Sequence, residues 1–249
     1  MTDPEVLARD YESDGCARIR GFLSPLLLSE VREALARYIR DRVPALPAGD
    51  RTLEADQTTV RNLWRMQEHD PFFKSLAERP EIRALVAKLV HGEPVLMAVE
   101  TFNKPARVGS GVPPHQDNAY FCQTPPDALT IWVAIDAATL ENGPIYYLKG
   151  SHTLRVLPHR PSGVAGNSMG LGEMPARTGD KSDEFCGTLE PGDAIVHHSQ
   201  TIHWSAPNKT DRPRCGMLLV YRGTHTKDDP DLKAAYDAAR AAPPAAAAV

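Results

Sequence analysis

Hydrophobic positions in the first third of the chain recur at helical spacing. Residues 17–22 predict a short strand, after which Ser24 and Pro25 suit the N-cap and first position of a helix. The apolar residues that follow predict one buried helix face: Leu28, Val31, Leu35 and Tyr38. Proline-containing pairs at 70–71 and 80–81 predict two more helix starts, and the second of these helices is expected to end at Gly92. Residues 42–60 show no period and are expected to form a loop.

From Pro94 onward the pattern changes to short runs rich in β-branched and aromatic residues, separated by glycine and proline. Such runs are typical of strands joined by turns: residues 95–102, 128–136, 144–150, 193–198 and 214–222. A last helix is expected over 231–240, and the Ala- and Pro-rich tail at 241–249 is expected to be frayed.

The order of these elements, helices first and then many strands, predicts the fold class. We expect a mainly β, α+β fold, namely a double-stranded β-helix (a cupin-like jelly roll) buttressed by N-terminal helices. No repeat or linker divides the sequence, so residues 1–249 are expected to form a single domain with its core at about 10–225. A length of 249 residues suits such a domain.

Composition excludes several functional classes. The net charge is −4 and no basic stripe is present, which argues against nucleic acid or an anionic membrane as a partner. No apolar run approaches the roughly 20 residues that cross a bilayer, and the acidic N-terminus does not resemble a signal peptide. The four cysteines are scattered without a CxxC pair, so we expect neither a disulfide framework nor a cysteine zinc site, and we expect a cytoplasmic protein.

The segment Pro113-Pro114-His115-Gln116-Asp117 is the first candidate for chemistry. In an extended chain, side chains two positions apart point to the same face, so His115 and Asp117 can both bind one metal ion. The two prolines disfavour a helix here. A His-x-Asp triplet by itself is common on surface loops, so it needs support from other residues.

A third ligand and a cation complete the pattern. His203 lies 86 residues after Asp117, just beyond a predicted turn and strand. Two histidines and one carboxylate form the facial triad of non-haem Fe(II) oxygenases, whose open positions suit a 2-oxo acid and O2. Arg214, eleven residues further on, can bind the distal carboxylate of 2-oxoglutarate through two hydrogen bonds. Gly216 shares its face and is expected to leave room for that cosubstrate. His197 and His198 are rival ligands, but only one histidine is needed.

Together these motifs resemble the phytanoyl-CoA dioxygenase family over about residues 10–222. The matching stretches, in chain order, are Asn103-Lys104-Pro105, His115-Gln116-Asp117, Tyr120-Phe121, Trp132-Val133-Ala134-Ile135-Asp136, Glu141-Asn142-Gly143-Pro144, Gly150-Ser151-His152, Gly192-Asp193, and His203 to Asn208 with Arg214. The resemblance implies a jelly roll with Fe(II) as cofactor and 2-oxoglutarate and O2 as cosubstrates. It also implies hydroxylation of an unactivated C–H bond of a small molecule, with release of succinate and CO2.

The resemblance also assigns roles to residues. It implies that His115, Asp117 and His203 bind iron and that Arg214 binds 2-oxoglutarate. Further cosubstrate positions correspond to Trp132, Arg61 and Glu100, although other members have an apolar residue at the last of these. Some members are halogenases with a small residue in place of the metal carboxylate, so Asp117 favours hydroxylation.

Several neighbouring residues are candidates for the substrate pocket: Gln116, Asn118, Tyr120, Phe121 and Trp204. The polar members of this set, with Arg61, favour a small polar metabolite as substrate. Residues 141–144 are expected to form a tight hairpin turn. The Gly- and Pro-rich segment 158–185 is a candidate lid.

Two alternatives to this enzyme remain open from the sequence. One is a jelly-roll binding protein that has lost catalysis, and intact ligands together with Arg214 argue against it. The other is a cupin-type metalloenzyme that takes no 2-oxo acid. Such sites usually have more histidines and no arginine clamp.

Overall fold

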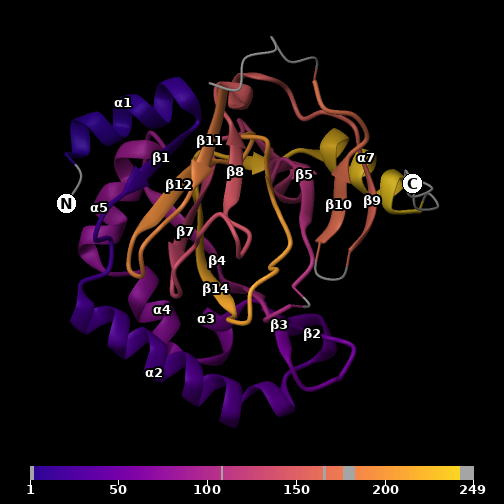
Figure 1. Cartoon of the computed structure of the whole chain (residues 1–249). Helices are drawn as coiled ribbons and strands as arrows, with labels where there is room; N and C mark the ends of the chain where they lie inside the picture. The colour runs from indigo at the N-terminus through magenta and orange to yellow at the C-terminus, as the bar shows by residue number, and fades with distance from the viewer. Residues whose placement is uncertain (1–2, 108, 165–166, 176–182, 242–249) are drawn as a thin grey trace.

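The computed structural model of the chain describes residues 3–107, 109–164, 167–175 and 183–241. Two antiparallel β-sheets lie face to face, and most of the helices cover the outer side of the larger sheet (Figure 1). This arrangement confirms the predicted jelly roll buttressed by N-terminal helices.

The larger sheet has seven strands and carries most of the predicted ones. Its order is β1 (Cys16–Ile19), β12 (Ala194–His198), β7 (Ala128–Ala134), β14 (Arg214–Gly223), β4 (Pro94–Lys104), β3 (Val60–Leu63) and β2 (Arg51–Leu53). The prediction that residues 42–60 form only a loop is therefore wrong for its second half, where β2 forms at Arg51–Leu53 and β3 begins at Val60. Strands of three and four residues are too short for a hydrophobic period to be visible in the sequence.

The smaller sheet has four strands and closes the barrel over the larger one. Its order is β11 (Glu184–Gly187), β8 (Ile145–Leu148), β13 (His203–Ser205) and β5 (Val112–His115). Two hairpins lie beside it, made of β9 (His159–Val164) with β10 (Asn167–Leu171), and of β6 (Gln123–Thr124) with β15 (Lys227–Asp228).

Seven α-helices are present in the described part of the chain: α1 (Pro4–Asp14), α2 (Pro25–Asp41), α3 (Met66–His69), α4 (Pro71–Ala77), α5 (Pro80–Leu89), α6 (Asn118–Phe121) and α7 (Pro230–Ala241). The Ser24 side chain accepts a hydrogen bond from the Leu27 N–H at 3.2 Å, which confirms the predicted N-cap of α2. The expected end of α5 at Gly92 is wrong, because its C-cap is Val90 and His91 takes the left-handed conformation with φ 49°. Within the described ranges, no helix has both the length and the apolar character that crossing a membrane requires.

Successive side chains along each strand point to opposite faces of the sheet, and the buried hydrophobic residues form two clusters. The larger cluster lies between the helices and the outer face of the seven-stranded sheet, and includes Val31, Phe73, Val99 and Leu219. The smaller cluster lies between the sheets and includes Trp132, Tyr147 and Ile195. The inner face of the larger sheet therefore faces the smaller sheet across the barrel.

Two expectations about connections need correction. Residues 141–144 do not close a tight hairpin, because the flanking β7 and β8 belong to different sheets; the turn crosses from one sheet to the other, with Gly143 at φ 83°. The candidate lid at 158–185 contains β9, β10 and the start of β11. Residues 165–166 and 176–182 of that segment, and 242–249 of the tail, lie outside the described residues.

Candidate metal and cosubstrate site

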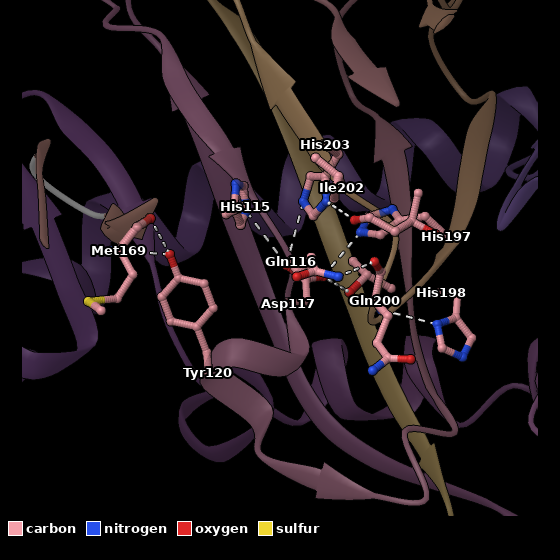
Figure 2. Close-up of polar contacts among 12 residues, drawn as sticks. His115, Gln116, Asp117, Tyr120, Met169, His197, His198, Gln200, Ile202 and His203 are labelled. Atoms are coloured by element: carbon pink, nitrogen blue, oxygen red, sulfur yellow. Dashed lines mark hydrogen bonds and ion pairs between the residues drawn. The ribbon is translucent and has the colours of Figure 1, made fainter. Parts of the chain in front are cut away.

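The three predicted metal ligands converge at one end of the barrel interior. His115 ends β5 and is the register partner of His203 on β13, so the two imidazoles lie side by side on one sheet. Asp117 follows two residues after β5, and its Oδ1 lies 3.7 Å from the His115 Nε2 and 3.5 Å from the His203 Nε2. One ligand atom from each residue falls within 4.8 Å of the others, a spacing at which all three can hold one ion (Figure 2).

Asp117 reaches this position by a different backbone from the one expected. The strand ends at His115, and Asp117 has helical angles of φ −61° and ψ −34° as it precedes α6. The i, i+2 rule for an extended chain therefore does not describe this turn, although the side chains of His115 and Asp117 do converge.

Backbone carbonyls fix the orientation of both histidine rings. The His115 Nδ1 lies 2.9 Å from the Pro113 carbonyl oxygen, and the His203 Nδ1 lies 2.9 Å from the Thr201 carbonyl oxygen. A hydrogen on each Nδ1 leaves the Nε2 lone pair directed at Asp117, where a metal would lie. Burial lowers the pKa of both histidines, which favours the neutral, metal-binding form.

The outer oxygen of Asp117 is held by two donors. Its Oδ2 accepts hydrogen bonds from the Thr130 hydroxyl at 2.9 Å and from the His197 Nε2 at 3.1 Å. Thr130 and His197 are register partners on β7 and β12, so the larger sheet presents both donors together. Burial alone would raise the pKa of Asp117, but the surrounding His203, His197 and His115 lower it well below its usual range, so the carboxylate is ionised.

The sequence treated His197 only as a rival ligand and missed this supporting contact. The strand alternation of β12 could have found it. His197 lies two positions after Ile195, whose side chain belongs to the cluster between the sheets, so both side chains are expected to point into the barrel.

A cavity of about 520 Å³ extends from the triad between the two sheets. Of the residues singled out in the sequence, these line it: Arg61, Glu100, His115, Asp117, Tyr120, Phe121, Trp132, His203, Trp204 and Arg214. Aromatic neighbours that the sequence did not single out, Trp64 and Phe102, also line it.

Arg214 lies buried in the cavity wall with donor capacity to spare. One guanidinium nitrogen (Nη2) donates to the Gly143 carbonyl oxygen at 2.8 Å, and the guanidinium carbon lies 5.1 Å from the centre of the Trp132 ring. Its buried Nε has no hydrogen-bond partner among the described residues. Buried polar groups are normally satisfied, so this donor is expected to meet a ligand.

Gly216 makes room for an aromatic ring. A Cβ added there would lie 2.1 Å from the Trp132 side chain, so only glycine allows the indole to lie against β14. The expectation that Gly216 leaves space for the cosubstrate directly is therefore wrong. The glycine places Trp132, which in turn contacts Arg214.

Two further basic side chains lie at the Arg214 end of the cavity. Lys104 is the register partner of Arg214 and donates from its Nζ to the Ser110 carbonyl oxygen at 2.6 Å. Arg61 lies 3.3 Å from the Ser110 hydroxyl and 3.4 Å from a Glu54 carboxylate oxygen. Burial first, and then the charges of Arg214 and Arg61, lower the pKa of Lys104 to about 6. A bound carboxylate would relieve this repulsion.

Gln116 and Asn118 do not line the cavity, which corrects their assignment as substrate residues. The Gln116 amide hydrogen-bonds to backbone groups of Gln200 and Leu157 at 2.9 and 2.8 Å. The Asn118 amide hydrogen-bonds to the Gln123 backbone. Both side chains are fully buried, and their role is to fix the turn that carries Asp117.

The donor set and the cation end together fit Fe(II) and 2-oxoglutarate. Two neutral imidazoles and one carboxylate on one side of a cavity are the facial triad donors. The buried Arg214, with an unsatisfied Nε, suits a planar carboxylate.

Comparison with known proteins agrees with this geometry. The sequence profile of the phytanoyl-CoA dioxygenase family matches residues 11–216. The chain belongs to this family. A mouse relative, phytanoyl-CoA dioxygenase domain-containing protein 1, is 33% identical over 155 residues, which are 60% of this chain and 52% of the relative. The match thus spans about half the length of that relative.

One further relative and one solved structure match this phytanoyl-CoA dioxygenase family member over more of its length. An L-proline trans-4-hydroxylase of Streptomyces griseoviridis is 25% identical over 238 residues, covering 88% of this chain and 87% of its own. The crystal structure of SnoN, a non-haem α-ketoglutarate-dependent epimerase from nogalamycin biosynthesis, superposes with a TM-score of 0.69 at 23% identity, covering 90% of this chain and 84% of its own. Family and architecture together indicate the fold of Fe(II)- and 2-oxoglutarate-dependent oxygenases with a His-Asp-His site.

Proposed function

We propose that this protein is an Fe(II)- and 2-oxoglutarate-dependent dioxygenase that hydroxylates an unactivated C–H bond of a small molecule. One observation carries the proposal. A single cavity has two neutral histidines and a carboxylate within 4.8 Å of one another in one part of its wall, and a buried arginine with an unsatisfied donor in another. A structural cluster would not leave both sets of groups directed at the same space.

Each residue has a separate task in this proposal. His115, Asp117 and His203 hold Fe(II), while Thr130 and His197 hold the outer oxygen of the Asp117 carboxylate. Arg214 binds the distal carboxylate of 2-oxoglutarate, with Trp132 against its guanidinium and Lys104 beside it. Fe(II), 2-oxoglutarate and O2 supply the oxidation, in which one oxygen atom enters succinate as CO2 leaves and the other enters the substrate.

The remaining cavity wall binds the substrate and excludes water. Tyr120, Phe121 and Trp204 supply aromatic surface around the triad. The small-polar-metabolite prediction relied partly on Gln116 and Asn118, which do not reach the cavity. The proposed substrate is a small molecule, because a cavity of about 520 Å³ must hold 2-oxoglutarate as well as the substrate.

The test is oxidation of 2-oxoglutarate by the Fe(II)-loaded protein, measured as succinate formed with and without candidate metabolites. The wild type is expected to form succinate slowly alone and faster with a substrate. Asp117→Ala and His203→Ala are expected to form none above the metal-only background. Wild-type succinate formation in either variant would remove that residue from the iron site.

Other results would identify the alternatives. Fe(II) binding without any effect of 2-oxoglutarate would indicate a metalloenzyme of another type. Binding of both with no succinate would indicate a binding protein. Faster succinate formation with a substrate that gains no oxygen atom would indicate a different outcome of the same oxidation, such as the epimerisation named for SnoN.

A further inference from the structure

Glu100 places a carboxyl group on the inner face of the larger sheet, within the cavity. Along β4, Val99 is fully buried in the cluster beneath the helices, and the alternate residue Glu100 points to the opposite face. Glu100 lines the same cavity as the metal triad. Its cross-strand neighbour is Leu218, which in turn pairs with Trp132, so the carboxyl lies in the sheet row that also carries the Trp132 indole.

Among the described residues, no hydrogen bond or close ion pair involves this carboxyl group; the cation that acts on it is Arg65, which is itself paired with Asp50. Burial, and next the negative charge of Asp117, raise the pKa of Glu100 to about 8. Glu100 is only partly buried, and its carboxyl group is accessible from the cavity that it lines. A carboxyl group without a protein partner in a cavity wall is expected to meet a complementary group of a ligand.

The charges in the cavity show which ligand Glu100 suits. The basic side chains Arg61, Lys104 and Arg214 also line the cavity and suit the carboxylates of 2-oxoglutarate, which would repel an ionised Glu100. The other acidic residue among the described cavity-lining residues is Asp117, and both of its oxygens are engaged at the metal site. A positively charged group entering the cavity would therefore find its one available carboxylate at Glu100.

The surroundings of Glu100 suit an aliphatic ammonium group in particular. Phe102 lies two residues along the same face of β4, and its ring meets Trp64 edge to face at a centroid distance of 5.1 Å. Aromatic faces attract cations and pack against aliphatic carbon. An amine held by Glu100 would also place neighbouring C–H bonds within the cavity that contains the iron ligands.

We propose that Glu100 binds an amine nitrogen of the substrate, so that the substrate class is a small aliphatic amine or amino acid with a free ammonium group. This inference rests on the proposed function, because it names the substrate of the same site. Glu100 acts here as a specificity residue that pairs with the ammonium group and takes no part in the oxidation.

The experiment compares free amines with derivatives whose nitrogen is acetylated and carries no charge. L-Proline and L-leucine are each compared with the Nα-acetyl derivative, and L-lysine is compared with the Nα,Nε-diacetyl derivative. Binding to the Fe(II)- and 2-oxoglutarate-loaded protein is measured by anaerobic calorimetry, and succinate formation is measured in air. At least one free amine is expected to bind and to accelerate succinate formation, and its acetylated partner is expected to do neither.

Variants then assign the effect to Glu100. Glu100→Gln keeps the size and removes the charge, and is expected to weaken amine binding about 30-fold or more, as for the loss of one partner of a buried charge pair. Its 2-oxoglutarate affinity is expected to change by less than about threefold. Glu100→Asp is expected to restore part of the amine binding, and the exposed Glu141→Gln is the control that leaves binding unchanged.

Several outcomes would overturn the inference. These are equal responses to the free and acetylated probes, no binding of any amine in the panel, and undiminished amine binding in Glu100→Gln. A loss in that variant confined to 2-oxoglutarate affinity would assign Glu100 to the cosubstrate instead. Amine binding that depends on Glu100 without any succinate formation would support this inference and contradict the proposed function, so the two failures are distinguishable.

Discussion

The two oxygens of the Asp117 carboxylate have different partners, and this division orients the iron site. Oδ1 faces the two ligand histidines, whereas Oδ2 is fixed by Thr130 and His197. A carboxylate held in this way loses little freedom when it binds a metal. The preorganisation comes from the larger sheet, while both histidine ligands come from the smaller one.

His197→Phe is expected to weaken Fe(II) binding by about 10- to 100-fold, the usual effect of removing a hydrogen bond to a metal ligand. Phenylalanine keeps a ring beside Tyr147 but cannot donate to Asp117. The measurement is an anaerobic Fe(II) titration. His198→Gln on the same strand is the control, because the side chain of His198 points to the opposite face of β12. An unchanged Fe(II) affinity in His197→Phe would mean that Thr130 alone orients the carboxylate.

Arg214→Ala is expected to raise the 2-oxoglutarate concentration needed for half-maximal succinate formation by at least about 30-fold, because a buried charged partner is removed. The exposed Arg212→Ala, two residues earlier, should leave this requirement unchanged. A normal requirement in Arg214→Ala would move the cosubstrate clamp to Lys104 or Arg61.

At the residue scale, the sequence singled out residues that lie around one cavity in the structure, but it missed several of the groups that surround them. The triad and Arg214 could be named because their residue types are rare in this combination. Lys104 and His197 were missed as functional groups, since their contacts depend on cross-strand register. Gln116 and Asn118 were misassigned because the chain leaves the strand at His115, after which alternation no longer predicts side-chain direction.

At the element scale, the β9–β10 hairpin is tied to the segment that carries Asp117. The Tyr120 hydroxyl donates to the Met169 carbonyl oxygen at 2.6 Å and accepts from the Met169 N–H at 3.2 Å (Figure 2). The Gln116 N–H donates to the His159 Nε2 at 3.0 Å. The described part of the segment expected to be a lid is thus attached to the metal site by hydrogen bonds.

Tyr120→Phe is expected to accelerate hydrogen exchange at the Met169 amide and to reduce stability by about 1 kcal/mol, the usual net contribution of one hydrogen bond. Exchange measured by mass spectrometry across 159–171 reports the change. Tyr236→Phe is the matched control on α7, since its ring also lies beside Tyr120, at a centroid distance of 6.0 Å. Equal exchange in the wild type and Tyr120→Phe would show that the hydroxyl does not hold the hairpin.

The long strands β4, β7 and β14 were predictable because each is a run rich in β-branched and aromatic residues, and glycine or proline separates such runs in the sequence. The short strands β2, β3 and β13 contain three or four residues each and are defined by their partners in the sheets. The helix cap at Ser24 was also predictable, since a capping side chain acts on the first turn of its own helix.

At the scale of the whole molecule, the helices support the sheet that orients Asp117. Phe73 is fully buried beneath that sheet and meets Tyr38 edge to face at a centroid distance of 5.4 Å. Phe73→Ala is expected to lower the free energy of unfolding by about 3–5 kcal/mol. The neighbouring Phe72, which is only partly buried, should cost less when replaced by alanine. Denaturant unfolding of both variants measures the two losses of unfolding free energy. A larger loss in Phe72→Ala than in Phe73→Ala would contradict this packing of the helices.

In the proposed function, a single cavity holds Fe(II) on His115, Asp117 and His203 and 2-oxoglutarate on Arg214. The most direct test is an anaerobic titration of the Fe(II)-loaded protein with 2-oxoglutarate, followed by the visible charge-transfer absorption of Fe(II) chelated by a 2-oxo acid. We expect a saturable absorption in the wild type, a much higher midpoint in Arg214→Ala and no absorption in Asp117→Ala. Absence of the absorption in the wild type, or its full retention in Asp117→Ala, would contradict the account.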